Sequence, residues 1–110
     1  MVSPAVGTVV LVKFPFSDLS ASKLRPAIVL AGVDRDDWIL CQITSKAFAD
    51  TRAVEILDAD FVSGNLMRPS YARPGKLFSA NTALMQRVVG QLTEPKLTAV
   101  LSAVIRLFRP

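Results

Sequence analysis

The chain has 110 residues, of which 51% are hydrophobic, and its mean hydropathy is +0.40. This content predicts a single folded domain over residues 1–110 and argues against intrinsic disorder. The 13 Lys and Arg residues outnumber the nine Asp and Glu residues, and the net charge of +4 favours an anionic partner such as nucleic acid. The absence of histidine excludes a Ser-His-Asp triad, a histidine acid–base pair and a histidine-ligated zinc site.

The single cysteine and the short apolar runs indicate where the protein resides. Cys41 lies in an apolar stretch and is predicted to be a buried thiol in a reducing compartment. The first four residues do not resemble a signal peptide, and the longest uncharged stretches are too short to cross a bilayer. We therefore expect a cytoplasmic protein without a membrane partner.

The first half of the chain predicts three strands. Gly7–Phe14 is rich in β-favouring residues, and the polar loop Pro15–Lys23 follows it. Arg25–Val33 is almost entirely apolar, which predicts a strand that is buried on both faces. The turn Asp34–Asp37 leads into a third strand, Trp38–Thr44, and these last two strands should pair as a hairpin.

The second half of the chain contains shorter elements. Ala53–Leu57 alternates and predicts a short fourth strand, and Ser63–Asn65 predicts a turn. Lys76–Ser79 is expected to be a further strand, Asn81–Arg87 a short helix, and Val88–Leu92 a final strand.

The C-terminal segment carries the clearest periodicity. Thr93 is the expected N-cap of a helix, with Glu94 and Pro95 in its first turn. Apolar residues recur along one side of this helix and are expected to pack on the sheet: Leu97, Val100, Leu101, Val104, Ile105 and Phe108. Several short strands followed by one helix predict a mainly β fold with a barrel or strongly bent sheet.

Three segments, taken in order, resemble the MazF/PemK/Kid toxins of type II toxin–antitoxin systems. The first is Gly7–Pro15 followed by Lys23–Leu30, the second is Gln42–Ser45, and the third is Leu66–Pro74. Each fragment alone is common, but their order and spacing resemble the family from about residue 6 to residue 108.

The resemblance implies a small SH3-like β-barrel, of the CcdB/MazF/PemK type, that forms a homodimer. It implies an endoribonuclease that cuts single-stranded RNA without a metal or cofactor and is silenced by an antitoxin protein. DNA would be contacted only indirectly, through an antitoxin complex. The family's active-site arginine and threonine match Arg25 and Thr44, and the serine and arginine of its later loop match Ser70 and Arg73. Some relatives carry an acidic residue where this chain has Gly75, which puts any mechanism that needs a carboxylate there in doubt.

Metal-free cleavage of RNA is best performed by the substrate's own 2′-hydroxyl, which attacks the adjacent phosphorus and leaves a 2′,3′-cyclic phosphate and a 5′-hydroxyl. The protein must hold the backbone in line and stabilise charge on the phosphoryl oxygens. Arg25 suits the second task because a planar guanidinium can bind two phosphate oxygens. Thr44 would donate a hydrogen bond beside it, and Arg73 would add a second positive charge from across the site. We therefore predict Arg25, Thr44 and Arg73 as the catalytic residues.

The loop after the first strand and nearby basic residues are candidates for RNA binding. An aromatic side chain at the start of the loop would stack on a base. The predicted RNA-binding residues are Lys13, Phe14, Phe16, Ser17, Asp18, Lys23, Ser45, Ser70 and Lys76. The general base is left open between Asp18, an arginine in an unusual setting, and no dedicated residue.

Two other functions fit the same residues. A CcdB-like toxin has this fold and binds a protein target such as gyrase, since a shared barrel does not fix activity. An inactive RNA-binding relative is the other alternative, which Gly75 keeps open. Without the resemblance, Arg25 and Thr44 would be read as an ordinary surface arginine and a strand-end threonine.

Overall fold

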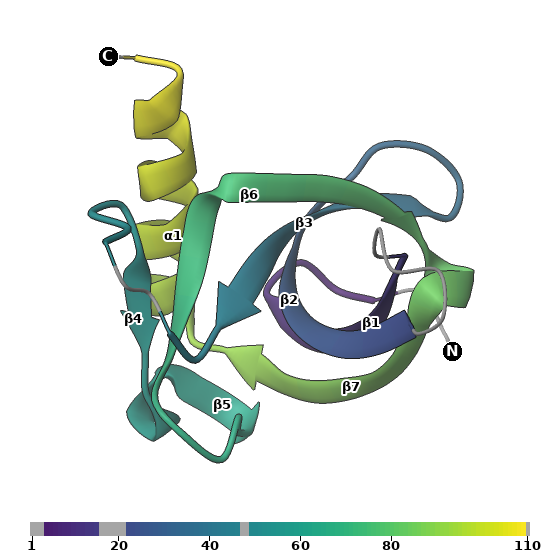
Figure 1. Cartoon of the computed structure of the whole chain (residues 1–110), viewed down its shortest axis with the longest axis horizontal. Coiled ribbons are helices and arrows are strands. Elements are labelled where there is room, and N and C mark those ends of the chain that lie inside the picture. Colours follow the sequence, from purple (N-terminus) through teal and green to yellow (C-terminus); the bar gives the residue numbers. More distant parts are fainter. Residues whose placement is uncertain (1–3, 16–21, 47–48, 110) are drawn as a thin grey trace.

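The computed structural model describes residues 4–15, 22–46 and 49–109. Within them, seven strands form one antiparallel sheet in the order β4-β6-β3-β2-β1-β7-β5, which curls into a half-barrel with one C-terminal helix (Figure 1). The elements are β1 (Thr8–Pro15), β2 (Ser22–Gly32), β3 (Asp37–Thr44), β4 (Val54–Ile56), β5 (Phe61–Gly64), β6 (Ser70–Asn81), β7 (Met85–Leu92) and α1 (Glu94–Leu107). The predicted mainly β, barrel-like fold with a terminal helix is confirmed.

The central strand β2 is covered on both faces, as its continuous apolar sequence predicts. Ile28 and Leu30 belong to the core between the sheet and α1. Ala27 and Val29 point to the opposite face and belong to a second core inside the curl of the sheet. β2 pairs with β3 as the expected hairpin. Burial on both sides makes β2 a rigid support for side chains near its start.

The helix α1 begins where the sequence predicts. Its N-cap Thr93 accepts a hydrogen bond from the backbone N–H of Lys96 at 3.4 Å. Val100 is buried, and Leu97, Leu101 and Val104 pack against the first core. The expectation that the apolar stripe packs along its full length is wrong, because Ile105 is 50% exposed and Phe108 is 74% exposed. The C-terminal end of α1 extends beyond the sheet (Figure 1).

The predicted helix Asn81–Arg87 is the main error in the expected elements. The structure has a single 3₁₀ turn there, Thr82–Leu84, and β7 already begins at Met85. The side chain of Asn81 accepts a hydrogen bond from the backbone N–H of Ala83, which stabilises a local turn in place of a helix. Pairing of β7 with β1 then overrides the helical preference of the remaining residues.

Two further segments differ from expectation. The short strand predicted at Lys76–Ser79 is the end of the longer strand β6, and the turn predicted at Ser63–Asn65 begins inside β5. In β5, Gly64 lies opposite Gly90 of β7, and the two backbones approach closely. Gly64 has φ +72°, a conformation that side chains rarely adopt.

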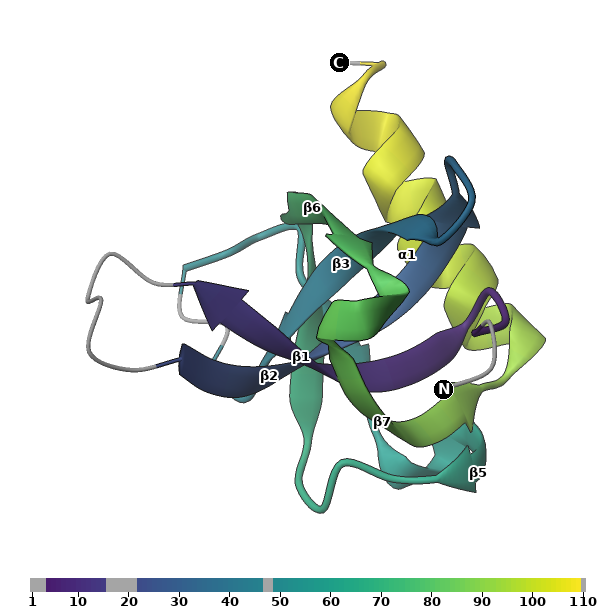
Figure 2. The same ribbon diagram turned by 90° about the vertical axis from the view of Figure 1, so that its right-hand side faces the viewer.

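The strands β1 and β2 pair with each other, and the end of β1 and the start of β2 lie on the side away from α1 (Figure 2). Among the residues described, no helix is long and apolar enough to span a membrane.

Candidate functional site

Arg25 and Thr44 project from neighbouring strands on the same side of the sheet. Arg25 lies near the start of β2, and Thr44 is the last residue of β3. Ala27 lies opposite Gln42 at the end of the β2–β3 pairing, and Arg25 and Thr44 lie two residues beyond this pair on their respective strands. Both residues are partly exposed. The guanidinium and the hydroxyl therefore come from adjacent strand ends, and neither residue is enclosed in the barrel.

An open cavity of about 370 Å³ lies at these strand ends. Arg25 and Thr44 both line it, together with Lys23, Ser45 and Ser70 of the predicted site. Its remaining lining residues are Leu11, Leu24, Pro26, Ile43, Leu66 and Arg68. The lining of the cavity thus combines three cationic side chains with several apolar ones, which suits a ligand with an anionic backbone and an apolar part.

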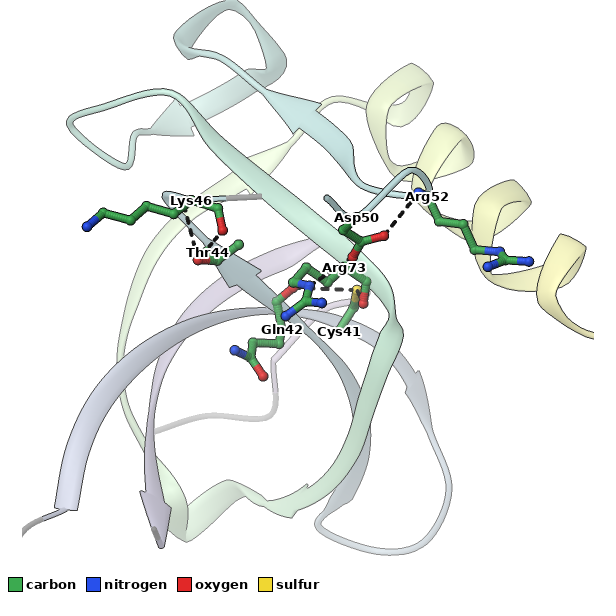
Figure 3. A network of polar contacts seen from close by, with 7 residues as sticks. All are labelled: Cys41, Gln42, Thr44, Lys46, Asp50, Arg52 and Arg73. Carbon is green, nitrogen blue, oxygen red and sulfur yellow. Dashed lines mark hydrogen bonds and ion pairs between the residues drawn. The ribbon is translucent and has the colours of Figure 1, made fainter. Parts of the chain in front are cut away.

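The hydroxyl of Thr44 is held by its own loop. Its Oγ1 accepts a hydrogen bond from the backbone N–H of Lys46 at 3.1 Å and donates a longer one to the carbonyl oxygen of Lys46 at 3.3 Å (Figure 3). A threonine has one hydroxyl proton, so a phosphate contact requires that proton to turn away from the carbonyl. The longer bond is weak, and its loss costs little.

The other predicted RNA-binding residues are distributed unevenly. Ser70 is buried, and its hydroxyl donates to the carbonyl oxygen of Arg68 at 3.1 Å. Lys13 is exposed on β1 and does not line the cavity. Phe14 lies in β1, but its side chain lies outside the described part of the structure, as do Phe16, Ser17 and Asp18. Lys76 lines a different cavity.

Arg73 lines this second cavity, of about 530 Å³, and not the one that Arg25 and Thr44 line. Thr44 lies opposite Tyr71, and Arg73 follows two residues later in β6. The Arg73 Nε donates to the Asp50 Oδ2 at 2.8 Å, and the two side chains point toward one another (Figure 3). The predicted second charge is therefore engaged by a carboxylate, away from the cavity that Arg25 lines.

The family model of PemK-like, MazF-like toxins of type II toxin–antitoxin systems matches residues 5–108. The chain belongs to this family. No curated protein matches the sequence significantly.

Solved structures show the same fold as this family member. MazF in the Form-II MazE–MazF complex of Deinococcus radiodurans is 18% identical, with a TM-score of 0.78 over 99% of this chain and 98% of that chain. The Mycobacterium tuberculosis toxin MazF-mt6 is 17% identical, with a TM-score of 0.71 over 93% and 96%. An endoribonuclease in complex with its cognate antitoxin, from a mycobacterial species, is 14% identical, with a TM-score of 0.72 over 99% and 96%. At such identities the likeness establishes the fold.

The Asp50–Arg73 ion pair of this toxin-family chain makes its stability depend on pH. The hydrogen bond from Arg73 is the main reason that the pKa of Asp50 lies below its usual value of 3.8. A lowered pKa in the folded state stabilises the protein above the usual value, and this stabilisation is lost as the pH falls through the lowered one. Asp50→Asn should therefore lower the free energy of unfolding at pH 7 by about 1 kcal/mol. The difference between variant and wild type should shrink below about pH 4 in urea titrations, whereas a constant difference would contradict the ion pair's role.

Cys41 is the buried free thiol that the sequence predicts. Its Sγ lies 3.2 Å from the carbonyl oxygen of Arg73, to which it donates. Burial raises the pKa of Cys41 to about 12. The native protein should therefore react negligibly with a thiol reagent such as 5,5′-dithiobis(2-nitrobenzoate) at pH 8, and the urea-unfolded chain should react fully. Rapid labelling of the native protein would show that the thiol is accessible.

Sequence reasoning missed the acidic partner of Arg73. Asp50 lies 23 residues earlier in a loop, and no spacing pattern links the two. It also missed Tyr71, because nothing in the sequence showed that this residue would lie opposite Thr44. Strand alternation within the segment Leu66–Pro74 was the available signal, since it places Tyr71 and Arg73 on one face.

Proposed function

We propose that this protein is a metal-independent, sequence-specific endoribonuclease toxin that cleaves single-stranded RNA. The 2′-hydroxyl attacks the adjacent phosphorus, the bond from phosphorus to the 5′-oxygen breaks, and that oxygen leaves with a proton as a 5′-hydroxyl. The other product ends in a 2′,3′-cyclic phosphate. Cleavage of messenger RNA would stop translation and growth.

The observation that supports this proposal is the placement of Arg25 and Thr44 at neighbouring strand ends on one cavity. In the proposed mechanism, Arg25 binds two phosphoryl oxygens and stabilises the charge that grows on them. The Thr44 hydroxyl donates to one of the same oxygens, and Lys23 contacts a neighbouring phosphate. A poison that acts only by binding a protein has no need for this pairing.

The proposed cleavage also requires a group that takes the proton of the 2′-hydroxyl and one that protonates the leaving oxygen. Arginine is a poor acid because its pKa exceeds about 12, and the chain contains no histidine. The candidates for the general base are therefore Asp18, which lies outside the described residues, an arginine in an unusual setting, or no dedicated residue. Arg73 would act by its charge. Because Arg73 is already paired with Asp50, it contributes less to stabilising the phosphoryl charge than Arg25 does.

Family membership supports the proposed partners. MazF of D. radiodurans and the mycobacterial endoribonuclease are described in complexes with antitoxins. We propose that a cognate antitoxin silences this protein, that the active form is a homodimer, and that it acts in the cytoplasm, where translated RNA is found.

The purified protein, assayed in EDTA with total cellular RNA, tests the proposal. We expect cleavage at a short recurring sequence, read by sequencing the new 5′-hydroxyl ends, and cyclic phosphates on the complementary ends. Salt-dependent RNA binding without products would identify an inactive relative. Inhibition of a topoisomerase without RNA cleavage would identify a CcdB-like poison and contradict the proposal.

A further inference from the structure

The second cavity has the composition of an anion-binding site. Arg52, Arg73 and Lys76 line it and carry three positive charges, against the single carboxylate of Asp50. Gly75 also lines it, and a β-carbon added there would meet no atom within 4 Å, so the space beside it is open. The apolar contribution comes from Ala49 and Leu107. A peptide groove would offer more apolar surface for side-chain anchors.

A bulge in β6 borders this cavity. On β3, Cys41 lies opposite Leu77 and Ile43 lies opposite Ala72, so residues 73–76 of β6 have no regular partners. A bulge of this kind bends the strand and redirects its side chains. It carries Arg73 and Lys76 into the second cavity. The hydrogen bond from the Cys41 thiol to the Arg73 carbonyl fixes the start of the bulge.

Asp50 orients the arginine and leaves most of its donors unused. The carboxylate accepts from the Arg73 Nε at 2.8 Å and from the backbone N–H of Arg52 at 3.0 Å. A guanidinium has five N–H donors. Within the described part of the chain, the hydrogen bond to Asp50 is the one made by the Arg73 side chain. The four N–H groups on its terminal nitrogens remain for a ligand, and the side chain is 32% exposed.

The two cavities border the same strand, β6. Ser70 lines the first, and Arg73, Gly75 and Lys76 line the second. Tyr71 comes between Ser70 and Arg73 along β6, lies opposite Thr44 and is partly exposed. An aromatic side chain within a cationic groove is a common arrangement for binding single-stranded nucleic acid.

We propose that the second cavity is an RNA subsite: it binds a phosphate that flanks the scissile one, and Tyr71 stacks on the base between them. This inference rests on the proposed function, because it takes the strand held by Arg25 and Thr44 as its starting point. Arg52 and Lys76 contact the flanking phosphate electrostatically, and Arg73 binds it through its terminal nitrogens. Cleavage should then be more efficient on a substrate long enough to reach this subsite.

Binding of an uncleavable RNA tests the subsite without requiring catalysis. The probe is a fluorescent single strand of roughly 12 nucleotides, with 2′-fluoro groups in place of the attacking hydroxyls. The slope of log affinity against log salt concentration should fall by about 0.7 in Arg52→Ala, and by a similar amount in Lys76→Ala. Arg35→Ala, which removes the same charge at an exposed turn outside both cavities, should leave the slope unchanged.

Tyr71 variants separate stacking from charge. Tyr71→Ala should weaken binding about tenfold at every salt concentration with no change in slope, because stacking is not electrostatic. Tyr71→Phe keeps the ring and should bind like the wild type. Urea unfolding of each variant confirms that the fold is intact.

The outcomes distinguish this inference from the proposed function. If the protein cuts RNA but Arg52→Ala and Lys76→Ala keep the wild-type slope, the subsite is wrong and the nuclease stands. If the protein binds the probe with the expected slopes but cuts no RNA, the nuclease is wrong and the subsite stands. If these variants lose affinity for an acidic peptide and not for the probe, the cavity belongs to a protein partner and the inference is overturned.

Discussion

Arg25→Ala should lower the rate constant of RNA cleavage by about 100-fold or more. Arg25 lies near the start of β2 and lines the same cavity as Thr44, where its guanidinium can stabilise charge that develops on the phosphoryl oxygens. Because that charge is greatest in the transition state, the loss should appear mainly in kcat. Single-turnover cleavage of a labelled RNA at saturating protein measures it directly.

Two variants test the reason for this effect. Arg25→Lys keeps the charge but loses the two-pronged geometry, so it should recover only part of the rate. Thr44→Val removes one neutral donor and should cost roughly tenfold. Arg35→Ala serves as the control for a lost surface charge and should cut RNA normally. Undiminished cleavage by Arg25→Ala would remove this residue from the mechanism.

Gly64→Ala should destabilise the protein by about 3 kcal/mol or more. A β-carbon on Gly64 would collide with the carbonyl oxygen of Val89 and lie 2.6 Å from the Cα of Gly90. The backbone also has φ +72°, which costs a residue with a side chain about 1–2 kcal/mol before any collision. Overpacking adds a similar amount. The free energy of unfolding, extrapolated from urea titration, gives the size of the loss.

The chain provides a matched control at Gly75. A β-carbon there meets no atom within 4 Å, so Gly75→Ala should change the free energy of unfolding by no more than about 1 kcal/mol. Gly90→Ala should behave like Gly64→Ala, because its β-carbon would lie 2.8 Å from the ring of Phe61. Equal stabilities of the Gly64 and Gly75 variants would show that β5 and β7 do not approach closely.

The elements with strong local patterns could be predicted from the sequence. The continuous apolar run of β2 predicts burial on both faces, and the helical spacing of apolar residues in α1 predicts burial on one face. Asn81–Arg87 could not be predicted, because its structure depends on pairing with β1, more than 70 residues away in the chain. The exposure of Phe108 likewise depends on where the sheet ends, which the helix's own sequence does not encode.

The candidate site, too, could be predicted from the sequence only in part. Arg25 and Thr44 lie on two strands that form a hairpin, so their proximity follows from local register. The partner of Arg73 does not, because the bulge in β6 and the loop that carries Asp50 come together only in the folded chain. The same bulge separates Arg73 from the cavity that it was predicted to share with Arg25. A strand register read from alternation alone cannot anticipate such a bulge.

The pairing of β1 with β7 has a consequence for synthesis of the protein. Thr8 lies opposite Gln91, so β1 can pair with β7 only after β7 has been translated. The hairpin that carries Arg25 and Thr44 is too small to be stable in water without the strands and helix around it. The groove that Arg25 and Thr44 line is therefore assembled only once β7 has joined the sheet.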